Sequence, residues 1–149
     1  MSRETVGRRM EILLVEDNLE DAGSTIQALK AGDVQCRVSV VCDGEEAMAF
    51  LHQENIFARA PRPDLILLDI GLPKKDGREV LAEIRGDDEL KGIPVVVLTA
   101  SLAHKVVLKG QGLHVDGYMT KPVSLDQFIE VVRSLRRSWL AEVILPELD

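Results

Sequence analysis

Short apolar runs and longer amphipathic segments alternate along the chain. Apolar residues, either continuous or alternating with polar ones, predict strands at 11–15, 35–42, 64–69, 93–100 and 115–120. Apolar residues at helical spacing predict helices at 19–32, 44–54, 77–86, 102–112 and 124–143. A strand-helix unit repeated five times predicts one α/β domain, a doubly wound (βα)5 sandwich with helices on both faces of a five-stranded parallel sheet.

Local signals mark where several of these elements begin and end. Asp43 has the position of a helix N-cap, and Glu46 follows three residues later as in a capping box. Ser124 is predicted to start the long last helix. The helix over 102–112 is a weak one, because each of its two interior glycines costs about 1 kcal/mol relative to alanine. Residues 55–63 are predicted to form a loop.

The composition suits a single soluble domain over residues 1–149, with 1–10 as a flexible tail. Hydrophobic residues make up 46% and charged residues 29% of the chain, which is typical of globular proteins. Aromatic residues are only 3%, so the core must be aliphatic, as in parallel strands covered on both faces. The start of the chain is polar and no apolar stretch approaches ~18 residues, so neither a signal peptide nor a membrane span is expected.

The two cysteines indicate a reduced, cytoplasmic protein. Cys36 and Cys42 would lie on one face of a strand, roughly 20 Å apart, which is too far for a disulfide. Both are therefore expected to be small core or half-core residues with free thiols.

The net charge of −7 argues against a nucleic-acid partner, because the phosphate backbone repels an acidic surface. Two basic clusters could compensate locally: Arg8 and Arg9 near the start, and Arg133, Arg136 and Arg137 near the end. Neither carries an aromatic platform or a recognition motif, so we interpret them as a solvated tail and a solvated helix face.

Polar residues stand where the predicted strands end. Glu16 and Asp17 follow the first strand, Asp69 ends the third, Thr99 ends the fourth and Lys121 follows the fifth. The carboxyl ends of parallel strands form the binding edge of such sheets. Three carboxylates close together repel one another, and a hard cation such as Mg²⁺ (or Mn²⁺) would balance them. Lys121 and the hydroxyl of Thr99 could contact a phosphoryl group. Together with the three carboxylates, they predict a phosphoryl-transfer site with a carboxylate nucleophile.

Each residue also has a simpler interpretation when it is taken alone. Asp17 could be a helix N-cap, Thr99 an ordinary strand-end hydroxyl and Lys121 a surface lysine. Asp69 could be a solvated cap at the end of its strand, since burying an unpaired carboxylate costs several kcal/mol. Only the phosphoryl-transfer hypothesis explains all the strand ends together.

Four segments carry a resemblance to a known family. LLVEDN, LILLDIGLPKKDG, VVVLTAS and GYMTKP are similar to the signature segments of bacterial response-regulator receiver domains, of the single-domain chemotaxis-regulator type, over about residues 11–140. The resemblance implies a flavodoxin-like fold and a part in two-component signal transduction. Such a module accepts a phosphoryl group from a sensor histidine kinase and switches protein-protein contacts. It is not an enzyme acting on a separate substrate, because phosphotransfer and dephosphorylation are self-catalysed, and no DNA-binding output domain is expected.

By matching position, the resemblance implies a role for each residue of the acidic set. Asp69 is the aspartate that accepts the phosphoryl group from a phosphohistidine. Asp17 and Asp69 bind Mg²⁺ directly, Glu16 helps through water, and the backbone carbonyl of Gly71 is a further ligand.

The resemblance also implies a switch. Thr99 and Lys121 contact the acyl phosphate, and Tyr118 takes the place of an aromatic residue that turns inward when Thr99 moves toward the phosphate. In this family the peptide between Lys121 and Pro122 is usually cis.

The loop at 55–63 and the end of the chain resemble one branch more closely, the small response regulators paired with cyanobacterial and bacterial phytochromes. The implied partner is a light-sensing histidine kinase, a bacteriophytochrome. Members of that branch tend to dimerise, and the extension at 141–149 offers a possible contact. Apolar residues continue past the last helix that the domain needs: Trp139, Leu140, Val143, Ile144 and Leu145. They could cover a homodimer interface or fold back on their own domain.

Two rival functions fit the sequence less well. A phosphatase of the haloacid-dehalogenase type needs a second acid two residues after its nucleophile, where this chain has Gly71. A receiver-like scaffold that is never phosphorylated would normally have lost part of the acidic set. Gly71 and Ser101 are small and leave room for water, so we expect a phosphorylated state that is not unusually long-lived. The downstream target is not indicated by the sequence.

Overall fold

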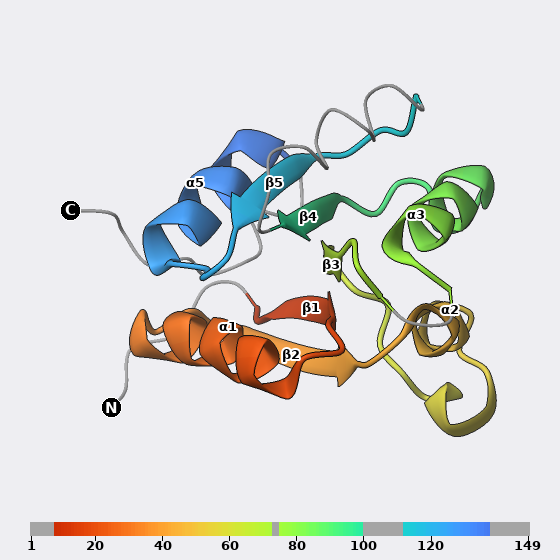
Figure 1. Ribbon diagram of the computed structural model, residues 1–149, viewed down its shortest axis with the longest axis horizontal. Helices are drawn as coiled ribbons and strands as arrows, with labels where there is room; N and C mark the ends of the chain where they lie inside the picture. Colours follow the sequence, from red (N-terminus) through yellow and green to blue (C-terminus); the bar gives the residue numbers. More distant parts are fainter. Residues whose placement is uncertain (1–7, 73–74, 100–111, 138–149) are drawn as a thin grey trace.

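The strands of the computed structural model form one parallel sheet in the order β2-β1-β3-β4-β5 (Figure 1). The structure describes residues 8–72, 75–99 and 112–137. The strands are β1 (Met10–Val15), β2 (Cys36–Val41), β3 (Leu65–Asp69), β4 (Val95–Thr99) and β5 (Gly117–Thr120). This order confirms the flavodoxin-like, doubly wound sheet that the alternating pattern predicts.

Helices lie on both faces of the sheet. They are α1 (Leu19–Ala31), α2 (Gly44–Leu51), α3 (Gly77–Gly86) and α5 (Leu125–Leu135), with a short 3-10 helix, η1 (Asn55–Phe57). Figure 1 shows α1 and α5 together on one face and α2 and α3 on the other. The helix predicted over 102–112 falls, except for its last residue, outside the described residues.

The central strand β3 explains why the sheet is aliphatic on both sides. Ile66 and Leu68 are buried with the residues of α2 and α3. Leu65 and Leu67, which alternate with them, are buried with the residues of α1 and α5. Alternate residues of a strand point to opposite faces, so a continuous apolar run is required where helices cover both.

Polar caps start the helices, and one of them corrects the sequence interpretation. The N-cap of α1 is Asn18, whose side chain accepts a hydrogen bond from Asp21 N at 3.0 Å, so Asp17 is not the cap. Asp43 caps α2 by accepting from Glu46 N at 2.8 Å, as predicted. The Glu46 carboxylate accepts in return from Cys42 N, one residue before the cap. The start of α5 at Ser124 is also confirmed.

Two predicted helices are shorter than the sequence pattern indicated. Helix α2 ends at Leu51 rather than at residue 54. Helix α5 ends at Leu135, where Arg136 adopts a left-handed backbone conformation with φ of 50°, so the predicted end of this helix at residue 143 was wrong. The tail residues proposed for a dimer contact lie outside the described part of the chain: Trp139, Leu140, Val143 and Leu145.

The cysteines and the basic clusters have ordinary surroundings. Both thiols are free, Cys36 half-buried in β2 and Cys42 exposed, so the half-core prediction was wrong for Cys42. Arg8 forms a two-pronged ion pair with Asp64, each contact 2.7 Å long. No helix within the described ranges is both long enough and apolar enough to cross a membrane.

Candidate functional site

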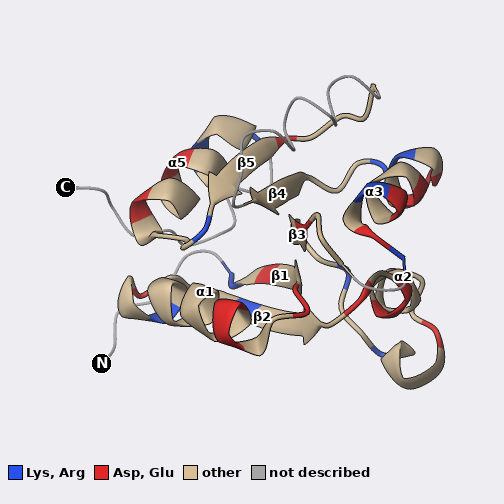
Figure 2. Ribbon diagram, in the orientation of Figure 1, with Lys and Arg blue, Asp and Glu red and all other residues tan. Residues whose placement is uncertain are grey.

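Three carboxylates meet at the carboxyl edge of the sheet, as predicted. Glu16 follows β1 directly and Asp69 ends β3, and these two strands are neighbours. One oxygen from each of Glu16, Asp17 and Asp69 lies within 4.8 Å of the other two. Figure 2 shows acidic segments where β1 runs into α1 and where β3 ends. Glu16 is almost completely buried, with 1% of its surface exposed, whereas Asp17 is exposed.

Lys121 reaches into this acidic edge from the end of β5. Its Nζ lies 2.6 Å from Glu16 Oε1 and 2.9 Å from Asp69 Oδ2. A third carboxylate, from Asp21, lies 3.2 Å from the same nitrogen. The peptide between Lys121 and Pro122 is cis, as the resemblance implied.

The crowding of charges shifts the pKa values of these groups. Burial, and a hydrogen bond to Asp69, raise the pKa of Glu16 to about 7. Burial opposes ionisation of Asp69 as well, but hydrogen bonds with Glu16 and Lys121 outweigh it and lower the pKa of Asp69. The pKa of Lys121 is raised, because its contacts with Glu16 and Asp69 outweigh the opposing effect of burial. Near neutral pH the metal-free site therefore holds an ionised Asp69, a charged Lys121 and a Glu16 that is only partly ionised.

The connection from β3 to α3 holds Asp69 in place through the backbone. Gly71 N donates to Asp69 Oδ1 at 3.0 Å. Gly77 N donates to Ile70 O at 3.1 Å, and a Cβ at Gly77 would lie only 2.6 Å from Asp69 O. Ordinary Cβ contacts are longer than 3.4 Å, so the first residue of α3 must be a glycine to pack this closely on the end of β3.

Thr99 and Tyr118 occupy the positions that the sequence analysis gave them. Thr99 is the last residue of β4, and its neighbour Leu98 pairs with Asp69 in the sheet register. Only 2% of the surface of Thr99 is exposed. Tyr118 lies in β5 and packs against the core on the α2 and α3 face, and burial raises the pKa of its hydroxyl.

Sequence reasoning missed two acidic residues that matter for the structure. Asp21 contacts Lys121 from the first turn of α1, and the sequence pattern carried no local signal for a contact between residues 100 positions apart. The side chain of Asp116, just before β5, is 7% exposed and binds two arginines at the opposite edge of the sheet. Its signal was an acid near the start of the strand predicted at 115–120.

The acidic cluster fits a hard divalent cation. Its donors are all carboxylate oxygens, which Mg²⁺ and Mn²⁺ accept. Burial and the neighbouring Asp69 raise the pKa of Glu16, so its charged form is disfavoured in the metal-free site. A divalent cation close to these carboxylates would favour their charged forms.

The sheet order and its acidic edge define an α/β signalling domain. The chain belongs to the response regulator receiver domain family, whose sequence model matches residues 12–133. Response regulator Rcp1 from Synechocystis sp. is 46% identical over 135 residues, which cover 91% of this chain and 92% of Rcp1. The family places the chain in two-component signal transduction, with a histidine kinase as the partner and a divalent metal ion as the cofactor.

Solved structures of relatives have the same fold. The bacteriophytochrome response regulator RtBRR superposes with a TM-score of 0.82 at 38% identity, over 93% of this chain and 83% of RtBRR. The phosphorylated cyanobacterial phytochrome response regulator RcpA superposes with a TM-score of 0.72 at 48% identity, over 93% of this chain and 99% of RcpA. The Mn²⁺-bound form of Rcp1 superposes with a TM-score of 0.70 at 45% identity, over 93% of this chain and 99% of Rcp1.

Proposed function

We propose that Asp69 accepts a phosphoryl group from the phosphohistidine of a sensor histidine kinase, in a Mg²⁺-dependent reaction. The observation that carries this proposal is the environment of Asp69. The carboxylate has a lowered pKa, lies 2.9 Å from the Lys121 ammonium and stands beside two further carboxylates that could share a metal ion. A carboxylate oxygen attacks phosphorus, the P–N bond to the imidazole breaks, and its electron pair leaves with the ring nitrogen.

The residues around Asp69 bind and orient the reacting groups. Gly71 N holds Asp69 Oδ1, which limits rotation of the carboxylate. Lys121 is close enough to balance the charge of an incoming phosphoryl group, and Thr99 at the end of β4 offers its hydroxyl to a phosphoryl oxygen. Bound Mg²⁺, held by Glu16, Asp17, Asp69 and the carbonyl of Gly71, would neutralise charge between the carboxylate and the phosphoryl group.

Phosphorylation would shift an existing equilibrium between two conformations. In this proposal Thr99 moves toward the phosphoryl group, and Tyr118 turns further into the core it already packs against. The surface that changes is a protein-binding one, and the output is an altered protein-protein contact. The net charge of −7 supports a protein target rather than nucleic acid.

The relatives support Mg²⁺ or Mn²⁺ as the ion and a phytochrome kinase as the partner. Rcp1 is known in a Mn²⁺-bound form, and RtBRR and RcpA are phytochrome response regulators. We assign a bacteriophytochrome as the partner kinase of this chain on that ground. The free thiols of Cys36 and Cys42 favour a cytoplasmic location, and the apolar tail residues, beginning at Trp139, are proposed to form a homodimer contact.

The chain is proposed to catalyse its own phosphorylation and dephosphorylation rather than to act on a separate substrate. A dehalogenase-type phosphatase is disfavoured because Gly71 replaces the second acid that it needs. Among the described residues, a Cβ at Gly71 would approach only Asp69 Oδ1, at 4.0 Å, so these residues leave room for water beside the carboxylate. This supports a phosphorylated state that is not unusually long-lived. A lifetime of many hours would contradict it.

Intact mass spectrometry after incubation with acetyl phosphate and Mg²⁺ tests the proposal. We expect the wild type to gain one phosphoryl group, and Asp69→Asn and an EDTA-treated wild type to gain none. A wild type without any mass increase, or equal labelling of Asp69→Asn, would contradict the assignment of Asp69. Size exclusion of the same samples tests the dimer, and a monomer peak in both states would rule out the tail contact.

The partner assignment needs a kinase experiment. Phosphoryl transfer from a purified bacteriophytochrome kinase is compared with transfer from a histidine kinase of an unrelated pathway. We expect faster transfer from the bacteriophytochrome, because the loop and tail of this chain resemble those of its partners. Equal rates from the two kinases would contradict this assignment and leave Asp69 as the acceptor.

A further inference from the structure

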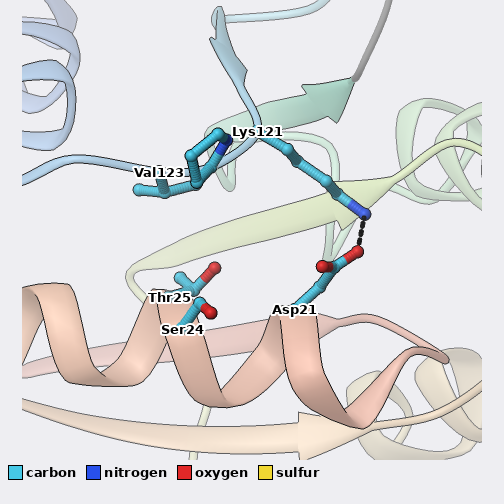
Figure 3. A pocket seen from close by; sticks show the side chains of 6 residues that line it. Asp21, Ser24, Thr25, Lys121 and Val123 are labelled. Atoms are coloured by element: carbon cyan, nitrogen blue, oxygen red, sulfur yellow. Dashed lines mark hydrogen bonds and ion pairs between the residues drawn. The ribbon is translucent and has the colours of Figure 1, made fainter.

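Asp21 contacts Lys121 from the side of α1. The Asp21 carboxylate points from the first turn of this helix toward the ammonium, at 3.2 Å (Figure 3). The contact borders a cavity of about 210 Å³ between α1 and the segment that joins β5 to α5. The cavity is lined by Asp21, Ser24, Thr25, Lys121, Pro122 and Val123.

The three carboxylates around Lys121 are not equivalent. An ammonium group has three N–H donors, and Glu16, Asp69 and Asp21 match them in number. Glu16 and Asp69 also belong to the acidic cluster that could hold a metal ion, together with Asp17. Within the described part of the chain, Asp21 is the partner of Lys121 that stands outside this cluster.

A metal ion in the cluster would compete with Lys121 for the same oxygens. The ammonium and the divalent cation repel each other, so Lys121 must loosen its contacts with Glu16 and Asp69 when the ion enters. Displacement of a half-buried ammonium without another partner would be unfavourable. Asp21 supplies that partner without moving into the metal site.

We propose that Asp21 is a positioning residue, which retains an ion pair with Lys121 when a metal ion takes the oxygens of Glu16 and Asp69. It thereby lowers the free-energy cost of metal binding and keeps the ammonium at the rim of the site. This inference rests on the metal site of the proposed function and is independent of phosphoryl transfer.

The expected effect is moderate. The side chain of Asp21 is 44% exposed and that of Lys121 is 19% exposed, so water screens the pair in part. Loss of such a pair corresponds to a change of about twofold to fivefold in the dissociation constant of Mg²⁺.

Isothermal titration of the full chain with MgCl₂ provides the test, as a double-mutant cycle. Asp21→Asn should raise the dissociation constant about twofold to fivefold. Glu20→Gln is the matched control, because it removes one negative charge from an exposed position in the same helical turn. Asp21→Asn should raise the dissociation constant more than Glu20→Gln does in the wild-type background. In the background of Lys121→Met, which has no ammonium to retain, this difference between the two substitutions should vanish. Lys121→Gln provides a second, polar background in case the apolar variant does not fold.

Three results would overturn the inference. They are an Asp21→Asn effect no larger than the control, an Asp21→Asn effect of equal size with and without Lys121, and a wild type that does not bind Mg²⁺. A chain that binds Mg²⁺ with the expected coupling but is not phosphorylated would contradict the phosphoacceptor role and leave this inference standing.

Discussion

Arg85 Nη2 lies 2.8 Å from Asp116 Oδ2 at the amino edge of the sheet, opposite to the acidic edge. The same carboxylate accepts from Val95 N at 2.8 Å and from Arg137 Nη2 at 2.8 Å. Burial opposes its charge, but the bond from Val95 N and the nearby Arg85 lower the pKa of Asp116. One buried carboxylate thus ties the last turn of α3 to the start of β4 and to the residues beyond α5.

Substitution of Asp116 should destabilise the fold strongly. Asp116→Ala leaves Arg85 Nη2 and the Val95 N–H without their acceptor, although Arg85 still donates to backbone carbonyls. We therefore expect the free energy of unfolding to fall by about 3 kcal/mol. Asp88→Ala removes only an exposed ion pair with Lys91 and should cost less than about 0.5 kcal/mol. Urea unfolding of both variants measures the difference, and similar values for the two would show that the buried network is unimportant.

Gly44 should not tolerate a side chain. A Cβ at this position would lie 1.9 Å from Lys75 O, a backbone atom, so the chain around Lys75 must move. We expect Gly44→Ala to destabilise by about 1–3 kcal/mol. Gly23→Ala, within α1, is the control, because a Cβ there meets no atom of the described residues within 4 Å. This substitution should stabilise the fold by about 0.5–1 kcal/mol. Thermal unfolding checks whether the two changes have opposite signs.

The metal-free protein should lose stability as the pH rises through the titration of Glu16. The pKa of this carboxyl is about 7 when folded and 4.5 when unfolded, so the folded state binds more protons between these values. The protonated Glu16 therefore stabilises the fold fully below pH 4.5, and this stabilisation is lost as the pH rises to 7. Over this range the free energy of unfolding should fall by up to about 1.4 kcal/mol per pH unit. Urea unfolding in EDTA from pH 4 to pH 8 should show this decline, and Glu16→Gln should abolish it. A decline of equal slope in Glu16→Gln would assign it to another group.

Mg²⁺ should stabilise the fold through the acidic cluster. Binding to the folded state alone adds about 2.7 kcal/mol at a Mg²⁺ concentration of 100 times the dissociation constant. Asp17→Asn removes an exposed carboxylate that is proposed as a ligand and makes no contact with Lys121, so it should abolish this gain without loss of stability in EDTA. Thermal unfolding with and without Mg²⁺ provides the measurement. Full Mg²⁺ stabilisation of Asp17→Asn would exclude Asp17 as a ligand.

The sequence predicted the sheet, and the reason is visible in β3. Its buried run from Leu65 to Leu68 needs helices on both faces, and only a parallel α/β sheet provides them. The meeting of Glu16, Asp17, Asp69 and Lys121 followed from the topology, because strand ends converge at one edge.

Other features depended on side-chain geometry that a pattern of residue types does not contain. The apolar periodicity continues past Leu135, yet the left-handed backbone of Arg136 ends the helix there. Asp17 and Asn18 are both suitable N-caps by type, and only the hydrogen bond to Asp21 N distinguishes them. The contact of Asp21 with Lys121 joins residues that are 100 positions apart in sequence, so no local signal could have shown it.

Helix α3 is fixed at both ends by contacts that require a specific geometry. At its start, Gly77 packs directly on the backbone of Asp69, and in its last turn Arg85 binds Asp116. Insertion or deletion of one residue between them would rotate Arg85 by about 100° around the helix axis, away from its partner. These two contacts therefore constrain the length of α3, which is ten residues. The constraint holds although no residue in the middle of the helix belongs to the proposed phosphorylation site.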